Sequence, residues 1–109
     1  HCDDVAGRIN RKLKELGLYE NTIVIYTSDN GCSPMADYPE LLSQGHNPSY
    51  VFRGTKADIY EGGHRIPLIV QWPDRVPEGR RCSRIVCLCD IMATMADILG
   101  ISLDAENGC

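Results

Sequence analysis

Hydrophobic positions follow two different periods in the first third of the chain. From Asp3 to Leu16, apolar residues recur every three or four positions and charged residues fill the rest, which predicts an amphipathic helix. Asp3 and Asp4 suit the positive end of that helix, and Gly17 suits a left-handed exit from it. Residues 22–27 then form an uninterrupted run of β-forming residues. Such a run predicts a strand covered on both faces, as in a parallel sheet.

The same patterns continue in the second half of the chain. Residues 66–72 predict a second buried strand and residues 85–88 a short third one. Asp90 suits the N-cap of a helix that ends before Gly100. The side chains expected on the buried face of this helix are Ile91, Met95, Ile98 and Leu99. Alternating helices and strands of this kind predict an α/β fold.

One long segment has no convincing period. Residues 32–53 are rich in proline and glycine, and only Tyr38 to Ser43 could form a helical turn. A loop of that length in a compact domain is usually functional or disordered, and its place directly after a strand end favours function.

The length, composition and charge of the chain exclude some classes of protein. The chain has 109 residues, 43% of them hydrophobic and 24% charged, as in an ordinary soluble globular domain. A net charge of −4, with basic residues scattered apart from Arg80-Arg81, argues against general nucleic-acid binding. No apolar run approaches the roughly 20 residues that span a bilayer. The start at His1, without an initiator Met, favours a segment of a longer protein.

Six cysteines are many for this length. None forms a Cys-x-x-Cys motif, and adjacent same-face cysteines such as Cys87 and Cys89 rarely have disulfide geometry. Buried thiols are therefore the favoured interpretation. A zinc site is not favoured, because no cysteine shows ligand spacing with His1, His46 or His64.

The first candidate site follows the apolar run at 22–27. In open α/β sheets, ligands bind beyond the carboxyl ends of the strands, where Asp29 and Asn30 would offer a carboxylate and an amide oxygen. These are hard donors suited to Ca²⁺ or Mg²⁺, and Gly31 would let the chain turn sharply away. Asp-Asn-Gly is equally typical of a plain turn, so both interpretations stay open.

The second candidate site lies in the charged, glycine-rich segment 53–67. Lys56, helped by Arg53, His64 and Arg65, could bind an anionic ligand. Alternatively, Glu61 pairs with Arg65 and the glycines only permit a tight turn. The residue types alone do not separate these two interpretations.

Several motifs together resemble the later part of the catalytic domain of type I, formylglycine-dependent sulfatases, in arylsulfatase-like form. They occur in the right order over nearly the whole chain. The motifs are the strand Asn21-Thr22-Ile23-Val24-Ile25-Tyr26-Thr27-Ser28-Asp29-Asn30-Gly31, the segment Arg53-Gly54-Thr55-Lys56 through Glu61-Gly62-Gly63-His64-Arg65-Ile66-Pro67, then Trp72-Pro73 and Asp90-Ile91-Met92-Ala93-Thr94. The resemblance implies an alkaline-phosphatase-like, mostly parallel sheet flanked by helices, of which residues 1–109 would be a C-terminal part.

The resemblance also implies roles for individual residues. Asp29 and Asn30 would bind the active-site divalent cation, usually Ca²⁺ with Mg²⁺ as the alternative, and Lys56 would contact the sulfate as a catalytic residue. His64 would either reach substrate or pack. The residues Glu61, Gly62, Gly63 and Arg65 would shape the loop. The implied activity is sulfuric ester hydrolysis on a sulfated carbohydrate or aryl sulfate, in a secreted, periplasmic or lysosomal enzyme.

The family's nucleophile is missing. It is a Cys or Ser in a Cys/Ser-x-Pro/Ala-x-Arg motif that is oxidised to formylglycine, and the segment from Cys32 to Ala36 has no arginine at its fifth position. The chain would therefore need the remainder of a sulfatase domain and be inactive alone. Two alternatives remain: a stand-alone module that binds a divalent cation, an anion or a protein partner, and a phosphoester-processing relative.

Overall fold

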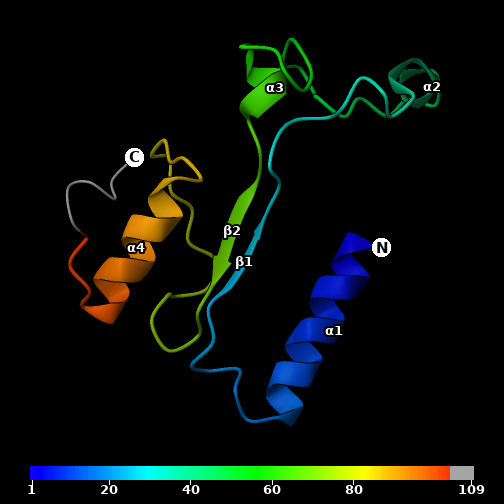
Figure 1. Cartoon of the computed structure of the whole chain (residues 1–109). Coiled ribbons are helices and arrows are strands. Elements are labelled where there is room, and N and C mark those ends of the chain that lie inside the picture. The colour runs from blue at the N-terminus through cyan, green and yellow to red at the C-terminus, as the bar shows by residue number, and fades with distance from the viewer. Residues whose placement is uncertain (104–109) are drawn as a thin grey trace. The chain divides into compact units, whose positions relative to one another are not determined.

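The computed structural model describes residues 1–103, which divide between two compact units. The first unit, His1–Gly79, contains α1 (Cys2–Glu15), β1 (Val24–Thr27), α2 (Tyr38–Ser43), α3 (Glu61–His64) and β2 (Leu68–Gln71) (Figure 1). The second unit begins at Arg80 and contains α4 (Asp90–Leu99). The predicted alternation of helices and strands is confirmed in the first unit.

Helix α1 forms where the amphipathic pattern predicts it. Gly17 has φ +67°, the left-handed exit expected from the sequence. The helix is tied to the sheet by Asn10, whose Nδ2 donates to Oε1 of Gln71 on β2 at 3.0 Å. At the first residue of the helix, a hydrogen bond with the Cys2 side chain raises the pKa of Tyr26 on β1 above its ordinary value. Helix α1 therefore contacts both strands.

The sheet differs from the sequence prediction. Strands β1 and β2 pair antiparallel, with Val24 opposite Gln71 and Thr27 opposite Leu68, and no parallel pair occurs in the described residues. Burial on both faces does not occur within residues 1–103, since Ile69 in the centre of β2 is 59% exposed. Each strand has one neighbour, and within residues 1–79 the apolar faces are only partly covered: Val24 and Ile25 are half-buried, while Leu68, Ile69 and Val70 are exposed.

The predicted third strand is absent. Residues 85–88 form no strand, and Ile85 is 100% exposed. A short apolar run becomes a strand only when a neighbouring strand pairs with its backbone, and the second unit contains no other strand among its described residues.

Helix α4 begins one residue earlier than predicted. Asp90 is its first residue and Cys89 the cap, although the Asp90 carboxylate accepts the Cys87 backbone N–H at 2.8 Å. Gly100 ends the helix with φ +65°, as predicted. The expected buried face is wrong in part, because Leu99 is 69% exposed. Ile98 is exposed too, Ile91 and Met95 are half-buried, and Ala96 is buried.

The cysteines are not buried as the sequence suggested. Cys2, Cys82, Cys87 and Cys89 are exposed and Cys32 is half-buried, while Cys109 lies outside the described residues. Cys2, Cys32, Cys82 and Cys87 are thiols. Among the helices of residues 1–103, none combines the length and apolar content that crossing a bilayer requires.

Candidate functional site

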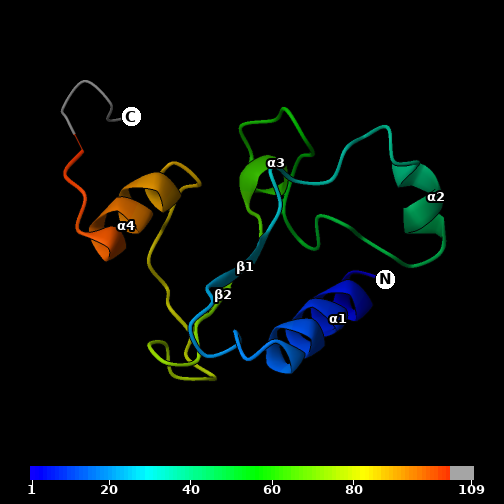
Figure 2. The same cartoon turned by 60° about the horizontal axis from the view of Figure 1, so that its bottom comes forward.

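The two candidate sites of the sequence lie side by side. The chain leaving β1 passes next to α3 in both views (Figures 1 and 2). The Gly31 N–H donates to the Gly63 carbonyl at 2.9 Å, and the Lys56 N–H donates to the Cys32 carbonyl at 2.9 Å. Asp29 and Asn30 therefore directly precede one of these links, and Lys56 makes the other. Segments 32 and 24 residues apart in sequence are thus joined through their backbones.

Glycines make this close approach possible. A Cβ added to Gly31 would lie 1.9 Å from the Gly62 carbonyl oxygen. One on Gly62 would lie 2.1 Å from the Gly54 oxygen, and one on Gly63 would lie 2.3 Å from the Asp58 oxygen. We call the contacts of Gly31, Gly54, Gly62 and Gly63 the glycine cradle. Gly31 does not have a positive φ, so its backbone conformation does not require glycine. The close approach to Gly62 does, because it leaves no room for a Cβ.

Helix α3 was not predicted, because two adjacent glycines disfavour a helix. Here both glycines are buried against residues 53–58, so their tertiary contacts outweigh that preference. The Gly62 N–H donates to the Arg53 carbonyl at 2.8 Å. The prediction that Gly62 and Gly63 shape the loop agrees with this packing.

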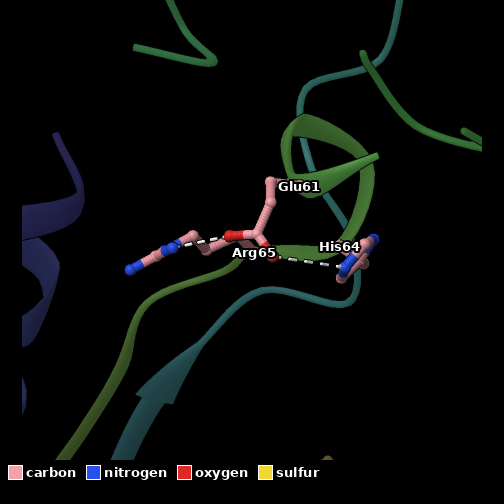
Figure 3. Close-up of polar contacts among 3 residues, drawn as sticks. All are labelled: Glu61, His64 and Arg65. Atoms are coloured by element: carbon pink, nitrogen blue, oxygen red, sulfur yellow. Dashed lines mark hydrogen bonds and ion pairs between the residues drawn. The ribbon is translucent and has the colours of Figure 1, made fainter. Parts of the chain in front are cut away.

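The charged side chains around α3 are mostly engaged with one another (Figure 3). Arg65 Nη1 lies 2.5 Å from Glu61 Oε2, which confirms the pairing that the sequence offered as an alternative. His64 is exposed, and its Nε2 lies 3.9 Å from Glu61 Oε1. The Arg53 guanidinium stacks over the Tyr60 ring at 4.0 Å. Arg53 and Arg65 thus have protein partners for their positive charges.

Lys56 is different. Its side chain is exposed, and its ammonium makes no ion pair or hydrogen bond with any residue that the structure describes. Its backbone is held by the Cys32 carbonyl. A cation on a fixed backbone with no protein partner is suited to binding an anion.

The oxygen donors after β1 fit a hard cation. Asp29 is exposed and Asn30 half-buried. Asn30 Nδ2 donates to the Gly31 carbonyl at 3.0 Å, which leaves its Oδ1 as the amide's acceptor atom. A carboxylate and an amide oxygen are donors that Ca²⁺ and Mg²⁺ accept. Among residues 1–103, no group of three or more His, Cys, Asp or Glu residues could hold a metal ion.

Sequence reasoning missed two residues that hold the Lys56 segment. The Asp58 carboxylate accepts the Thr55 N–H at 2.8 Å. The Ser49 hydroxyl, in a residue only 6% exposed, donates to the Gly54 carbonyl at 3.0 Å. Both are residue types whose side chains bond nearby backbone in turns, and that signal could have identified them.

Comparison with known proteins gives a consistent result. The sulfatase family model matches residues 1–101. The chain is 42% identical over 104 residues to an arylsulfatase of Hemicentrotus pulcherrimus, covering 95% of this chain and 18% of that protein. It is 37% identical over 105 residues to a mouse steryl-sulfatase, covering 94% of this chain and 16% of that protein.

Proteins from Bacteroides thetaiotaomicron are similar in sequence and in structure. An N-acetylgalactosamine-6-O-sulfatase from this bacterium is 39% identical over 102 residues, covering 89% of this chain and 19% of that protein. A solved structure described under the metabolism of multiple glycosaminoglycans superposes with a TM-score of 0.81 at 36% identity. It covers 93% of this chain and 22% of that chain. The chain therefore spans about a fifth of the length of the proteins it matches.

Proposed function

Because the chain belongs to the sulfatase family, we propose that it supplies part of the active site of a complete sulfatase domain that hydrolyses sulfate esters. The observation that supports this most directly is the pair of backbone links between the Asp29-Asn30 segment and the Lys56 segment. In this proposal residues 1–109 are a C-terminal part of the catalytic domain. Strand β1 then joins a larger, mostly parallel sheet built with the remainder of that domain.

Asp29 and Asn30 are the proposed ligands of a divalent cation, Ca²⁺ with Mg²⁺ as the alternative. Their oxygen donors fit either ion, and further ligands come from outside this chain. When bound, the cation stabilises negative charge on the sulfate oxygens.

Lys56 is the proposed sulfate contact and catalytic residue. Its ammonium has no protein partner among the described residues, and its backbone is fixed to the Cys32 carbonyl. A preorganised positive charge stabilises the transition state as charge develops on the transferred group. His64 is the proposed substrate-binding residue on the same segment, because its side chain is exposed.

The chemistry needs a nucleophile that this chain does not supply in the family's form. Cys32 is half-buried, and the segment that follows it lacks the arginine of the family motif. The proposed substrates are sulfated carbohydrates or aryl sulfates. Relatives named for N-acetylgalactosamine 6-sulfate and for steryl sulfate are consistent with a sulfate ester.

The test is steady-state kinetics on the complete domain with an aryl sulfate. Lys56→Ala should lower kcat/KM by about 10² or more, and Lys56→Arg should recover only part of that loss, since a planar guanidinium does not replace a compact ammonium. Lys12→Ala is the matched control, because Lys12 is an exposed lysine paired with Glu15 on α1. Full activity of Lys56→Ala at an unchanged melting temperature would overturn the sulfate contact.

A further inference from the structure

The segment that carries Lys56 is closed by a pair of hydrogen bonds between the same two residues. The Thr55 N–H donates to Asp58 Oδ2 at 2.8 Å, and the Asp58 N–H donates to the Thr55 carbonyl at 3.0 Å. Lys56 and Ala57 are the two residues inside this turn. The Asp58 side chain therefore forms one of the two bonds that close the loop around Lys56.

The turn contains a residue in an unfavourable conformation. Ala57 has φ +77°, in the left-handed region that residues with a Cβ rarely adopt. Such a conformation persists only when surrounding contacts hold it. The two bonds between Thr55 and Asp58 span Ala57 and are contacts of this kind.

Asp58 is itself fixed by the glycine cradle. A Cβ on Gly54 would lie 3.0 Å from both Cβ and Oδ2 of Asp58, and one on Gly63 would lie 2.3 Å from its carbonyl oxygen. Asp58 is thus packed between two glycines of the cradle. Its carboxylate lies beside Gly54, and its carbonyl lies beside Gly63, whose own carbonyl accepts the Gly31 N–H.

We infer that Asp58 is a positioning residue for Lys56: its carboxylate, closing the Thr55–Asp58 turn, fixes the direction in which the Lys56 ammonium leaves the backbone. This inference rests on the proposed function of Lys56 as the sulfate contact. The direction in which sulfate affinity changes when Asp58 is replaced distinguishes this role from an electrostatic one. A negative charge close to an anion site would weaken anion binding by Coulomb repulsion. A purely electrostatic role therefore predicts tighter sulfate binding without Asp58, and a positioning role predicts weaker binding.

The test compares three variants of the complete domain, with inorganic sulfate as a competitive inhibitor and an aryl sulfate as substrate. Asp58→Asn keeps an oxygen acceptor for the Thr55 N–H and should stay within about threefold of the parent. Asp58→Ala should lower kcat/KM about tenfold and raise the inhibition constant of sulfate by a similar factor, as expected when one closing hydrogen bond is lost. Asp58→Glu keeps the charge but displaces the acceptor, and should resemble alanine.

The control is Asp97→Ala, an exposed aspartate on α4, which should leave both constants unchanged. Equal losses in Asp58→Asn and Asp58→Ala, or tighter sulfate binding in both, would overturn the positioning role. If the alanine variant does not fold, the other two variants test the same point. The positioning role predicts a larger loss of activity and sulfate affinity in Asp58→Glu than in Asp58→Asn, and equal losses would overturn it.

A double-mutant cycle separates this inference from the function on which it rests. If Asp58 acts through Lys56, Asp58→Ala should have no further effect in a Lys56→Ala background. An undiminished tenfold effect there would overturn the inference and leave the role of Lys56 intact. If Lys56→Ala alone had no effect, the proposed sulfate contact of Lys56 would be overturned, and with it the inference about Asp58.

Discussion

The glycine cradle and the antiparallel pair of strands β1 and β2, here called the β1–β2 ribbon, differ in how their backbones make contact. In the cradle, backbone meets backbone within hydrogen-bonding distance, as in the link from the Gly31 N–H to the Gly63 carbonyl, and Gly62 and Gly63 are buried. In the ribbon, the strands are regular, but Tyr26, Leu68, Ile69 and Val70 are exposed. The backbones of the site-bearing segments are thus joined by contacts within this chain, whereas the strands leave several apolar side chains exposed in the described residues.

The difference teaches which parts of the chain depend on the rest of a domain. A backbone cradle needs only the absence of side chains at a few positions, and this chain provides that itself. An apolar strand gains free energy only when its faces leave water. Because relatives of this chain are about five times longer, we expect the remainder of the domain to cover those faces.

The strongest test of the cradle is Gly31→Ala. Its new Cβ would lie 1.9 Å from the Gly62 carbonyl oxygen, so the backbone must move. We expect the complete domain to lose about 3 kcal/mol or more of unfolding free energy, as in severe overpacking. Chemical denaturation measures this loss.

The matched control for that variant is Gly7→Ala in α1. A Cβ there would meet only the flexible Arg11 side chain at 3.6 Å, so alanine should stabilise the domain by about 0.5–1 kcal/mol. Similar effects of the two substitutions would mean that the cradle is not closely packed.

The ribbon is tested by Ile69→Ala. In the complete domain, where we expect β2 to be covered, the substitution should cost about 2 kcal/mol or more. In the 109-residue chain alone it should cost less than about 0.5 kcal/mol, because the side chain is already exposed. A small cost in both settings would contradict a cover over this face.

A smaller effect is expected at the contact between α1 and β2. Asn10→Ala removes the donor to Gln71 Oε1 and should cost about 1 kcal/mol. Replacing both Asn10 and Gln71 by leucine should be nearly neutral, because Asn10 Oδ1 and Gln71 Nε2 are buried without partners already. Thermal unfolding of the single and double variants checks this, and a double variant worse than the single would show that the amide pair has a net stabilising role.

The smallest effect is expected at the exposed pair on α3. Glu61→Gln should change the unfolding free energy by about 0.5 kcal/mol or less, because both side chains of the Glu61–Arg65 pair are exposed to solvent. The change should fade as salt is added. A larger, salt-independent cost would show that this ion pair, and not the glycine backbone, holds α3.

The periodic parts of the chain were predictable, and their partners were not. The amphipathic pattern gave α1, and the helical turn expected at Tyr38 to Ser43 has those bounds as α2. The strand predicted at 85–88 is absent, because a short apolar run says nothing about whether a partner strand is present. Helix α3 was missed because Gly62 and Gly63 are poor helix formers until their contacts with residues 53–58 are known.

The candidate site residues were named from the sequence, but their assembly could not be predicted from it. Residue types pointed to Asp29, Asn30 and Lys56, and their assigned roles stay predictions. No pattern in the sequence could show that the Lys56 N–H meets the Cys32 carbonyl, since backbone contacts between distant segments leave no periodic signal. Asp58 carried a local signal, as an aspartate three residues after Thr55, but its meaning depended on that assembly.

The link between Lys56 and Cys32 has a consequence for hydrogen exchange. The Gly31 and Lys56 amide protons are both bonded across the same junction, so they should exchange with solvent deuterium as one cooperative unit. A cation held by Asp29 and Asn30 would then slow exchange at Lys56, although Lys56 does not touch it. By reciprocity, an anion held by Lys56 would raise the affinity for that cation, which makes the junction a thermodynamic coupling between the two ligands.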